Sequence, residues 1–202
     1  MAPISYRILF VRHGETDYNA EGRLQGQRDI PLNRRGRAQA SAIGRALRTA
    51  MPEAIAALEA AQAFIASPLS RTRETMDLAR AALGLAPSRY ALEPALRELT
   101  FGEWEGLTWP QVAKRDPAGA RARESDKWNF APPDGESYAM LAQRLQPWLE
   151  SRQADCFVVS HGGVARALMT LIAGVSPSAA ENAEIWQGKA ILFESGGMRW
   201  VG

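Results

Sequence analysis

The chain contains only two histidines, and each follows a short apolar run of the kind that forms a buried strand. His13 comes after residues 7–11 and Arg12, and His161 comes after residues 156–160. Histidine can act near neutral pH as a nucleophile, an acid, a base or an anion ligand. If both runs are strands of an α/β sheet, the two imidazoles lie at strand ends, where such sheets place their ligand crevice.

Arginines near these strand ends predict an anionic ligand. Arg12 precedes His13, and a guanidinium matches phosphate oxygens with two hydrogen bonds. Its charge also disfavours imidazolium and keeps the His13 ring neutral and nucleophilic, while Gly14 allows close approach of the backbone. Arg71 lies near the expected start of a helix, where partial positive charge and free N–H groups bind anions. Taken singly, the motif at residues 12–14 could be structural, and Arg71 could pair with a surface carboxylate.

Three carboxylates lie among apolar residues at 96–106 and are candidates for proton transfer. A carboxyl group held beside a bound phosphate could donate a proton and later accept one. Each of the three, Glu98 included, could instead be a solvated loop residue, and we expect this of Glu103 and Glu105. His161 and Gly162 form a second turn from a strand into glycine.

The elements that must position these groups alternate between strands and helices. We expect strands at residues 7–11, 63–66, 90–92, 157–159, 191–194 and 198–201, the last two as a hairpin. We expect helices at residues 34–49, 51–61, 67–83, 137–152, 163–173 and parts of 108–124. Asn33 is expected to cap the first of these helices. The helix at 67–83 is expected to have Pro68 in its first turn and Gly84 as its C-cap. This alternation predicts an α/β fold with three α/β/α layers and a mostly parallel central sheet.

The composition indicates one globular domain, residues 1–202. The chain is 46% hydrophobic and carries a net charge of +2, with acids and bases interspersed, so we expect neither a nucleic-acid nor a membrane partner. The arginines at 34, 35 and 37 are expected to form a solvated helix start. No apolar run is long enough to span a membrane, and we recognise no signal peptide.

The only cysteine, Cys156, lies in an apolar run, so no intrachain disulfide can form. We expect Cys156 to be a small buried hydrophobe rather than a nucleophile. These features favour a cytoplasmic protein. No His/Cys cluster has metal-ligand spacing, so we expect no metal.

The motifs together resemble the histidine phosphatase superfamily, also called phosphoglycerate mutase-like. The matching blocks run in family order and are residues 12–16 with Asn19, 22–26, 31–32, Gly36, 67–72 with Thr75, 96–106, 160–163 and the tail at 182–183. The resemblance implies the phosphoglycerate mutase-like fold and phosphoryl transfer without a cofactor.

The resemblance also implies a role for each matching residue. His13 would be the nucleophile and become phosphohistidine. Arg12, Arg71 and His161 would clamp the phosphate oxygens. Glu98 would protonate the leaving oxygen and then deprotonate the attacking water. The further substrate-binding residues would be Asn19, which adds a hydrogen bond, Gln25, Gly26 and Gly162.

The same blocks favour a phosphatase over a mutase. Phosphatases of the family typically have Phe-Gly-x-Trp-Glu-Gly, found at residues 101–106, and Pro-x-Gly-Glu-Ser, found at 133–137. Mutases instead carry Tyr-Gly and a longer insertion with adjacent arginines, whereas residues 127–133 offer one cation and two aromatics. We therefore expect a phosphomonoesterase acting on a small phosphorylated metabolite. The alternatives are a cofactor-dependent phosphoglycerate mutase and a non-catalytic phosphate-binding domain.

Residues 107–138 are expected to form a lid over the pocket. The lid aromatics either meet an apolar or ring-bearing substrate or, as we favour, pack the lid in place; they are Trp109, Trp128, Phe130 and Tyr138. Sugar phosphates, a nucleotide-like ribazole phosphate, phosphoglycerate and phosphoprotein all remain candidate substrates. No oligomeric state is predicted.

Overall fold

A six-stranded sheet forms the centre of the computed structural model, which describes residues 4–201. The strands lie in the order β3–β2–β4–β1–β5–β6. Their bounds are β1 Ile8–Arg12, β2 Phe64–Ala66, β3 Ala91–Leu92, β4 Cys156–Ser160, β5 Ala190–Glu194 and β6 Gly197–Val201. β3, β2, β4 and β1 are mutually parallel, while β5 and β6 form the expected antiparallel hairpin at one edge. The mostly parallel sheet is confirmed.

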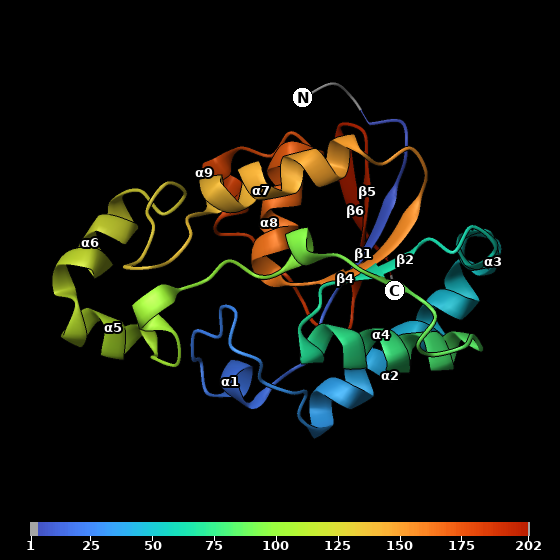
Figure 1. The fold of residues 1–202 in the computed structure, drawn as a ribbon, viewed down its shortest axis with the longest axis horizontal. Helices are drawn as coiled ribbons and strands as arrows, with labels where there is room; N and C mark the ends of the chain where they lie inside the picture. Colours follow the sequence, from blue (N-terminus) through green and yellow to red (C-terminus); the bar gives the residue numbers. More distant parts are fainter. Residues whose placement is uncertain (1–3, 202) are drawn as a thin grey trace.

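Helices cover both faces of the sheet because its central strands are apolar on both sides. Ile8 and Phe10 of β1 pack into the core formed with α7 (Tyr138–Glu150) and α8 (Gly162–Leu171). Leu9 and Val11 point to the opposite face, covered by α2 (Arg34–Ala50), α3 (Pro52–Ala60) and α4 (Ser70–Leu83). Figure 1 shows α7 and α8 on one side of the sheet and α2 and α4 on the other. The three-layer α/β/α fold is confirmed.

The start of α4 differs from the prediction. The helix begins at Ser70 rather than at residue 67, and Pro68 lies before it instead of in its first turn. The Ser67 N–H still donates to the Val159 carbonyl of β4 at 3.0 Å, and the Ser67 carbonyl accepts from the Thr72 hydroxyl at 2.8 Å. Ser67 therefore remains hydrogen-bonded to the central sheet, directly after the end of β2. The predicted cap at Gly84 is present, with φ of 86°.

The sequence analysis did not predict the short helices of the fold. They are α1 (Asp17–Ala20), the 3₁₀ helices η1 (Pro94–Leu96) and η2 (Gly102–Trp104), and α9 (Pro177–Ala180). η2 lies in a segment that was expected to be a loop. Elements of one turn carry almost no periodic signal, so only their neighbours in the fold stabilise them.

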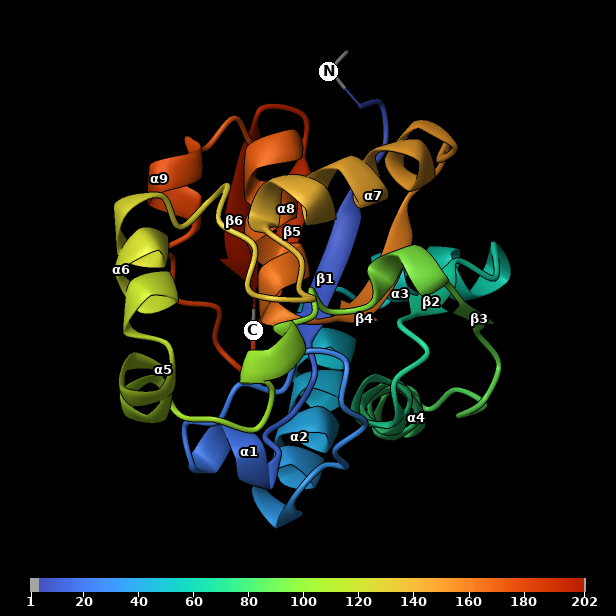
Figure 2. The same cartoon turned by 60° about the vertical axis from the view of Figure 1, so that its left-hand side comes forward.

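Residues 107–138 contain α5 (Trp109–Arg115) and α6 (Pro117–Ser125). In both views these helices lie at one side of the molecule, away from β2 and α3 (Figures 1 and 2). A small separate core attaches them, in which Phe130 stacks on Trp104 with ring centroids 5.4 Å apart. No helix within residues 4–201 has the length and apolarity needed to cross a membrane.

Candidate active site

The two histidines lie side by side at the ends of β1 and β4. The strands pair in parallel with Arg12 opposite Ser160, and the His13 N–H donates to the Ser160 carbonyl at 2.9 Å. The two imidazole centroids are 5.2 Å apart, and both rings are buried. The strand pairing therefore sets the distance between the two rings.

A backbone contact fixes the tautomer of His13. Its Nδ1 lies 2.7 Å from the Gly14 carbonyl oxygen, which can only accept, so Nδ1 carries the proton. Nε2 then carries the lone pair. Burial lowers the pKa of His13 well below its usual range, and the charges of Arg71 and Arg12 lower it further. The ring is neutral near pH 7, as a nitrogen nucleophile requires.

His161 is held from the side by Ser67, whose hydroxyl lies 2.8 Å from His161 Nε2. His161 Nδ1 is buried and has no hydrogen-bond partner among residues 4–201. Burial is again the main cause that lowers the His161 pKa, followed by Arg71 and His13. His13 lines the cleft, whereas His161 is fully buried and is not among the lining residues.

Two guanidinium groups face the same space without a carboxylate partner in the part of the chain described. Arg71 is fully buried and donates to the carbonyls of Gly26 and Arg28, both at 2.8 Å. Arg12 donates to the Ile185 carbonyl at 2.7 Å. The Nε of each arginine is buried and unpartnered.

Burial is the main cause that lowers the pKa of both arginines, that of Arg71 to about 10. The alternative that Arg71 pairs with a surface carboxylate is wrong. Desolvation of the buried Arg71 and the half-buried Arg12, which only carbonyls hold, costs free energy that an anion in the cleft would offset.

Glu98 reaches the same cleft from the loop after η1. Its Oε2 accepts a hydrogen bond from the Gly163 N–H at 3.1 Å, and its Oε1 accepts from the Leu99 N–H at 3.1 Å. A methyl group on Gly163 would overlap Glu98 Oε1, so the close approach needs glycine. The first turn of α8 thus holds the carboxylate in the cleft that His13 also lines.

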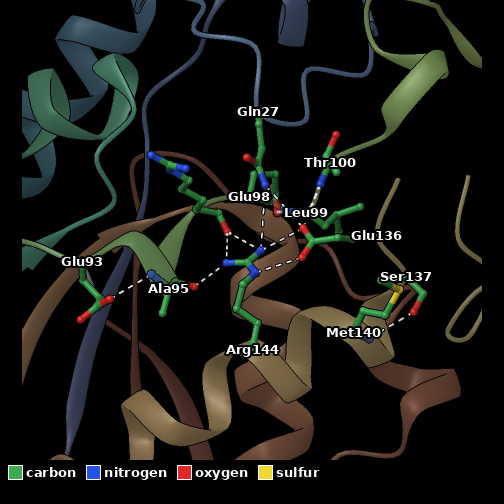
Figure 3. Close-up of polar contacts among 11 residues, drawn as sticks. Gln27, Glu93, Ala95, Glu98, Leu99, Thr100, Glu136, Ser137, Met140 and Arg144 are labelled. Carbon is green, nitrogen blue, oxygen red and sulfur yellow. Dashed lines mark hydrogen bonds and ion pairs between the residues drawn. The ribbon is translucent and has the colours of Figure 1, made fainter. Parts of the chain in front are cut away.

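A polar cluster holds the backbone that carries Glu98 (Figure 3). Arg144 of α7 donates to both carboxylate oxygens of Glu136, at 3.0 and 3.1 Å, and to the Ala95 carbonyl at 2.6 Å. Gln27 donates to the Glu98 carbonyl at 3.1 Å, and Glu136 accepts from the Thr100 N–H at 3.2 Å. The Pro-x-Gly-Glu-Ser stretch was predicted as a motif without a role; here its glutamate anchors this loop.

Of the remaining predicted binding residues, Asn19, Gln25, Gly26 and Gly162 all line the cleft. The Asn19 side-chain oxygen accepts from Gln187 at 3.0 Å and also belongs to the cap of α1. Gln25 accepts from the Thr16 hydroxyl at 2.9 Å. These side chains already have protein partners, so a ligand would share or replace them.

The expectation that Glu105 is a solvated loop residue is wrong. Its side chain is 11% exposed and its Oε1 accepts from the Thr100 hydroxyl at 2.8 Å and the Gln27 N–H at 2.9 Å. Its carboxylate also fills the space beside Gly26, where a Cβ would collide with it. Glu103 is exposed, as expected.

The cleft has a volume of about 310 Å³ and is lined mainly by polar groups. Polar lining residues that lie outside every block quoted in the sequence analysis are Tyr18, Arg123, Arg166 and Glu181. Residues 127–133 contain one cation, Lys127. In the structure, α6 adds Arg123 and α8 adds Arg166 to the cleft that Lys127 lines. Of the aromatic residues within 107–138, Trp109 and Tyr138 line the cleft, whereas Trp128 stacks on Tyr138 with ring centroids 5.5 Å apart.

Within residues 4–201 no three His, Cys, Asp or Glu side chains gather as a metal-binding group. Cys156 is buried, and burial raises the pKa of its thiol to about 12, as suits a packing residue.

The chain is similar in sequence and in fold to known proteins. The family model described as histidine phosphatase superfamily (branch 1) matches residues 8–201. A metal-independent phosphoserine phosphatase of Arabidopsis thaliana is 35% identical over 84% of this chain and 69% of its own length. A probable phosphoglycerate mutase of Erwinia tasmaniensis is 31% identical over 86% and 77%. A mycobacterial glucosyl-3-phosphoglycerate phosphatase solved with VO3 has a TM-score of 0.76 at 28% identity, covering 97% of this chain and 96% of its own.

Proposed function

The chain belongs to the histidine phosphatase superfamily, branch 1, and on that basis we propose that it is a phosphomonoesterase that hydrolyses a small phosphorylated metabolite through a phosphohistidine intermediate. One observation carries the proposal. The buried, neutral His13 carries its lone pair on Nε2 and lines one cleft with Arg71, which is buried, and Arg12, which is half-buried; neither arginine forms an ion pair with a carboxylate of residues 4–201. This arrangement fits a phosphate ester and a nucleophile that attacks it.

In the first step, His13 Nε2 attacks phosphorus and the bond to the ester oxygen breaks. Arg12, Arg71 and His161 bind the three phosphoryl oxygens and stabilise the charge on them, which is the main requirement of phosphoryl transfer. Protonated Glu98 gives its proton to the departing alkoxide, since an alkoxide is a poor leaving group. The alcohol then leaves.

In the second step, water attacks the phosphohistidine. Glu98, now a carboxylate, accepts the proton of that water, and the P–N bond breaks to return the electron pair to His13. Inorganic phosphate then dissociates from Arg12 and Arg71. The N-terminal turn of α8 at Gly162 adds a partial positive charge near the phosphoryl group.

We also propose that residues 107–138 serve as a lid within one domain. Trp109 of α5, Arg123 of α6 and Lys127, which follows α6, line the cleft. A segment attached mainly by its own small core can shift without disrupting the central sheet.

The test is to trap the intermediate. After brief mixing with a labelled phosphate ester, the wild type should carry acid-labile, base-stable label, and His13→Ala should carry none. His161→Ala should label weakly, because the phosphate clamp is weakened but the nucleophile remains. Substantial labelling of His13→Ala would remove it as the nucleophile, and absence of both label and phosphate release would leave a non-catalytic binding domain.

The chain is 31% identical in sequence to the probable phosphoglycerate mutase of Erwinia tasmaniensis, so a mutase is the second candidate. The wild type should release inorganic phosphate without a bisphosphorylated primer. Interconversion of 3-phosphoglycerate and 2-phosphoglycerate faster than phosphate release would establish the mutase instead.

A further inference from the structure

The cleft contains three cationic side chains that the proposed phosphoryl chemistry does not use. Arg123 and Lys127 come from α6 and the residues after it, and Arg166 comes from α8. We refer to these three residues as the outer cation cluster. Each is half-buried in the cleft wall.

Neutral groups hold the outer cation cluster in place. The Arg123 guanidinium lies 4.2 Å above the Trp109 ring centroid, Lys127 Nζ donates to Asn182 at 2.9 Å, and Arg166 Nε donates to the Ala183 carbonyl at 3.1 Å. None of the three forms an ion pair with a carboxylate of residues 4–201. Their charges are therefore oriented but not neutralised.

Two arginines at the surface differ from the outer cation cluster because they form ion pairs. Arg7 and Arg37 pair with carboxylates at 2.6 Å, and both are about half exposed. In the outer cluster, burial is the main cause that lowers the pKa of Arg123 and Lys127, and the charge of Arg166 lowers both further. Glu181 lines the same cleft and offsets only part of this charge. Uncompensated, partly desolvated cations are stabilised when an anion binds them.

The outer cluster adjoins the phosphoryl site. A Cβ built on Gly162 would lie 3.4 Å from Arg166 Nη1 and 3.6 Å from Arg12 Nε. Arg166 therefore borders the arginine that we assign to the phosphoryl oxygens. One small molecule can bridge the two sets of cations.

We propose that the outer cation cluster binds a second anionic group, a carboxylate or a second phosphate, carried by the organic part of the substrate. This inference rests on the proposed function and narrows it to dianionic or more highly charged metabolites. Arg123 and Arg166 can offer paired N–H donors to either anion, and Lys127 adds a point charge.

The experiment compares three esters with one carbon skeleton. Glycerol 3-phosphate has no second anion, 3-phosphoglycerate has a carboxylate, and glycerol 1,3-bisphosphate has a second phosphate. The wild type should prefer one of the two charged esters over glycerol 3-phosphate in kcat/KM, and the preferred one identifies the anion.

The variant Arg123→Gln/Lys127→Gln should then lose about 10- to 100-fold in kcat/KM on the charged ester, mainly through KM. Its loss on glycerol 3-phosphate should be less than about threefold, because that ester makes no ion pair there. Arg121→Gln is the matched control, since Arg121 is an exposed cation of the same helix and does not line the cleft. Unchanged inhibition by vanadate would establish that the phosphoryl site is intact in each variant.

Equal losses on all three esters, or no loss on any, would overturn the inference. So would a wild type that prefers glycerol 3-phosphate, or one that hydrolyses p-nitrophenyl phosphate but neither charged ester; phosphatase activity would stand in both cases. Absence of turnover on every ester together with absence of phosphoenzyme would instead contradict the proposed function itself.

Discussion

The Gly163 N–H donates a hydrogen bond to the Glu98 carboxylate at 3.1 Å. This bond joins the helix that follows His161 to the loop that carries the proposed proton donor. The two residues are far apart in sequence, and each is positioned by the other. Small changes in the first turn of α8 should therefore displace Glu98 relative to His13.

Gly163→Ala should separate these two residues, because the added methyl overlaps Glu98 Oε1. We expect kcat on an alkyl phosphate to fall by roughly 10- to 100-fold, as a small misplacement of a catalytic group can cost. Gly197→Ala is the control, since a Cβ there meets no atom within 4 Å. Steady-state kinetics would measure both, and equal activity of the two variants would contradict the positioning role.

Glu98→Gln should lower turnover of an alkyl phosphate by about 10²–10⁴, because the departing alkoxide is not protonated. Phosphorylation by an aryl phosphate with a weakly basic leaving group should suffer much less. Hydrolysis of phosphohistidine still needs the base, so the aryl substrate should give a burst of phenol followed by slow turnover. Equal losses on both substrates without a burst would exclude Glu98 as the acid.

The lowered pKa of His13 and His161 predicts a pH dependence of stability. In the unfolded chain both rings bind protons below about pH 6.5, whereas the folded chain keeps them neutral to lower pH. The unfolded state then binds more protons, so the free energy of unfolding should fall as the pH drops below about 6.5. Urea denaturation at about pH 7.5, 6.5 and 5.5 would measure this. His13→Asn and His161→Asn should each reduce the slope, and an unchanged slope would contradict the prediction.

Arg144→Met should leave the Glu136 carboxylate without its two-point partner and loosen the loop that holds Glu98. We expect a loss of about 1–3 kcal/mol in the free energy of unfolding and a lower kcat with little change in KM. A double-mutant cycle with Glu136→Gln should show that the two losses are not additive. Additive losses, or an unaltered kcat, would mean that the pair does not position the loop.

Chelation should leave activity intact, because the proposed transition state draws its positive charge from Arg12 and Arg71. Vanadate should inhibit, since it can adopt the geometry of phosphorus under attack. Loss of activity in EDTA that a divalent ion restores would contradict this source of charge.

The sequence by itself determined the layered fold and the local settings of the two histidines. Strand periodicity, helix caps and the turns that begin at His13 and His161 depend on neighbouring residues, so they are readable along the chain. The motif at residues 96–106 likewise placed Glu98 in a segment between a strand and the following helix. These local patterns were sufficient to predict the three layers and the strand ends that the structure contains.

Only the tertiary structure decided which distant groups meet. Arg123, Lys127 and Arg166 come from two separated segments, and no pattern along the chain predicted that they share one cleft. Glu105 resembled a loop carboxylate but is enclosed by backbone N–H groups and a hydroxyl. Long-range packing sets burial and pairing, and burial and pairing decide whether a charge is solvated, structural or available to a ligand.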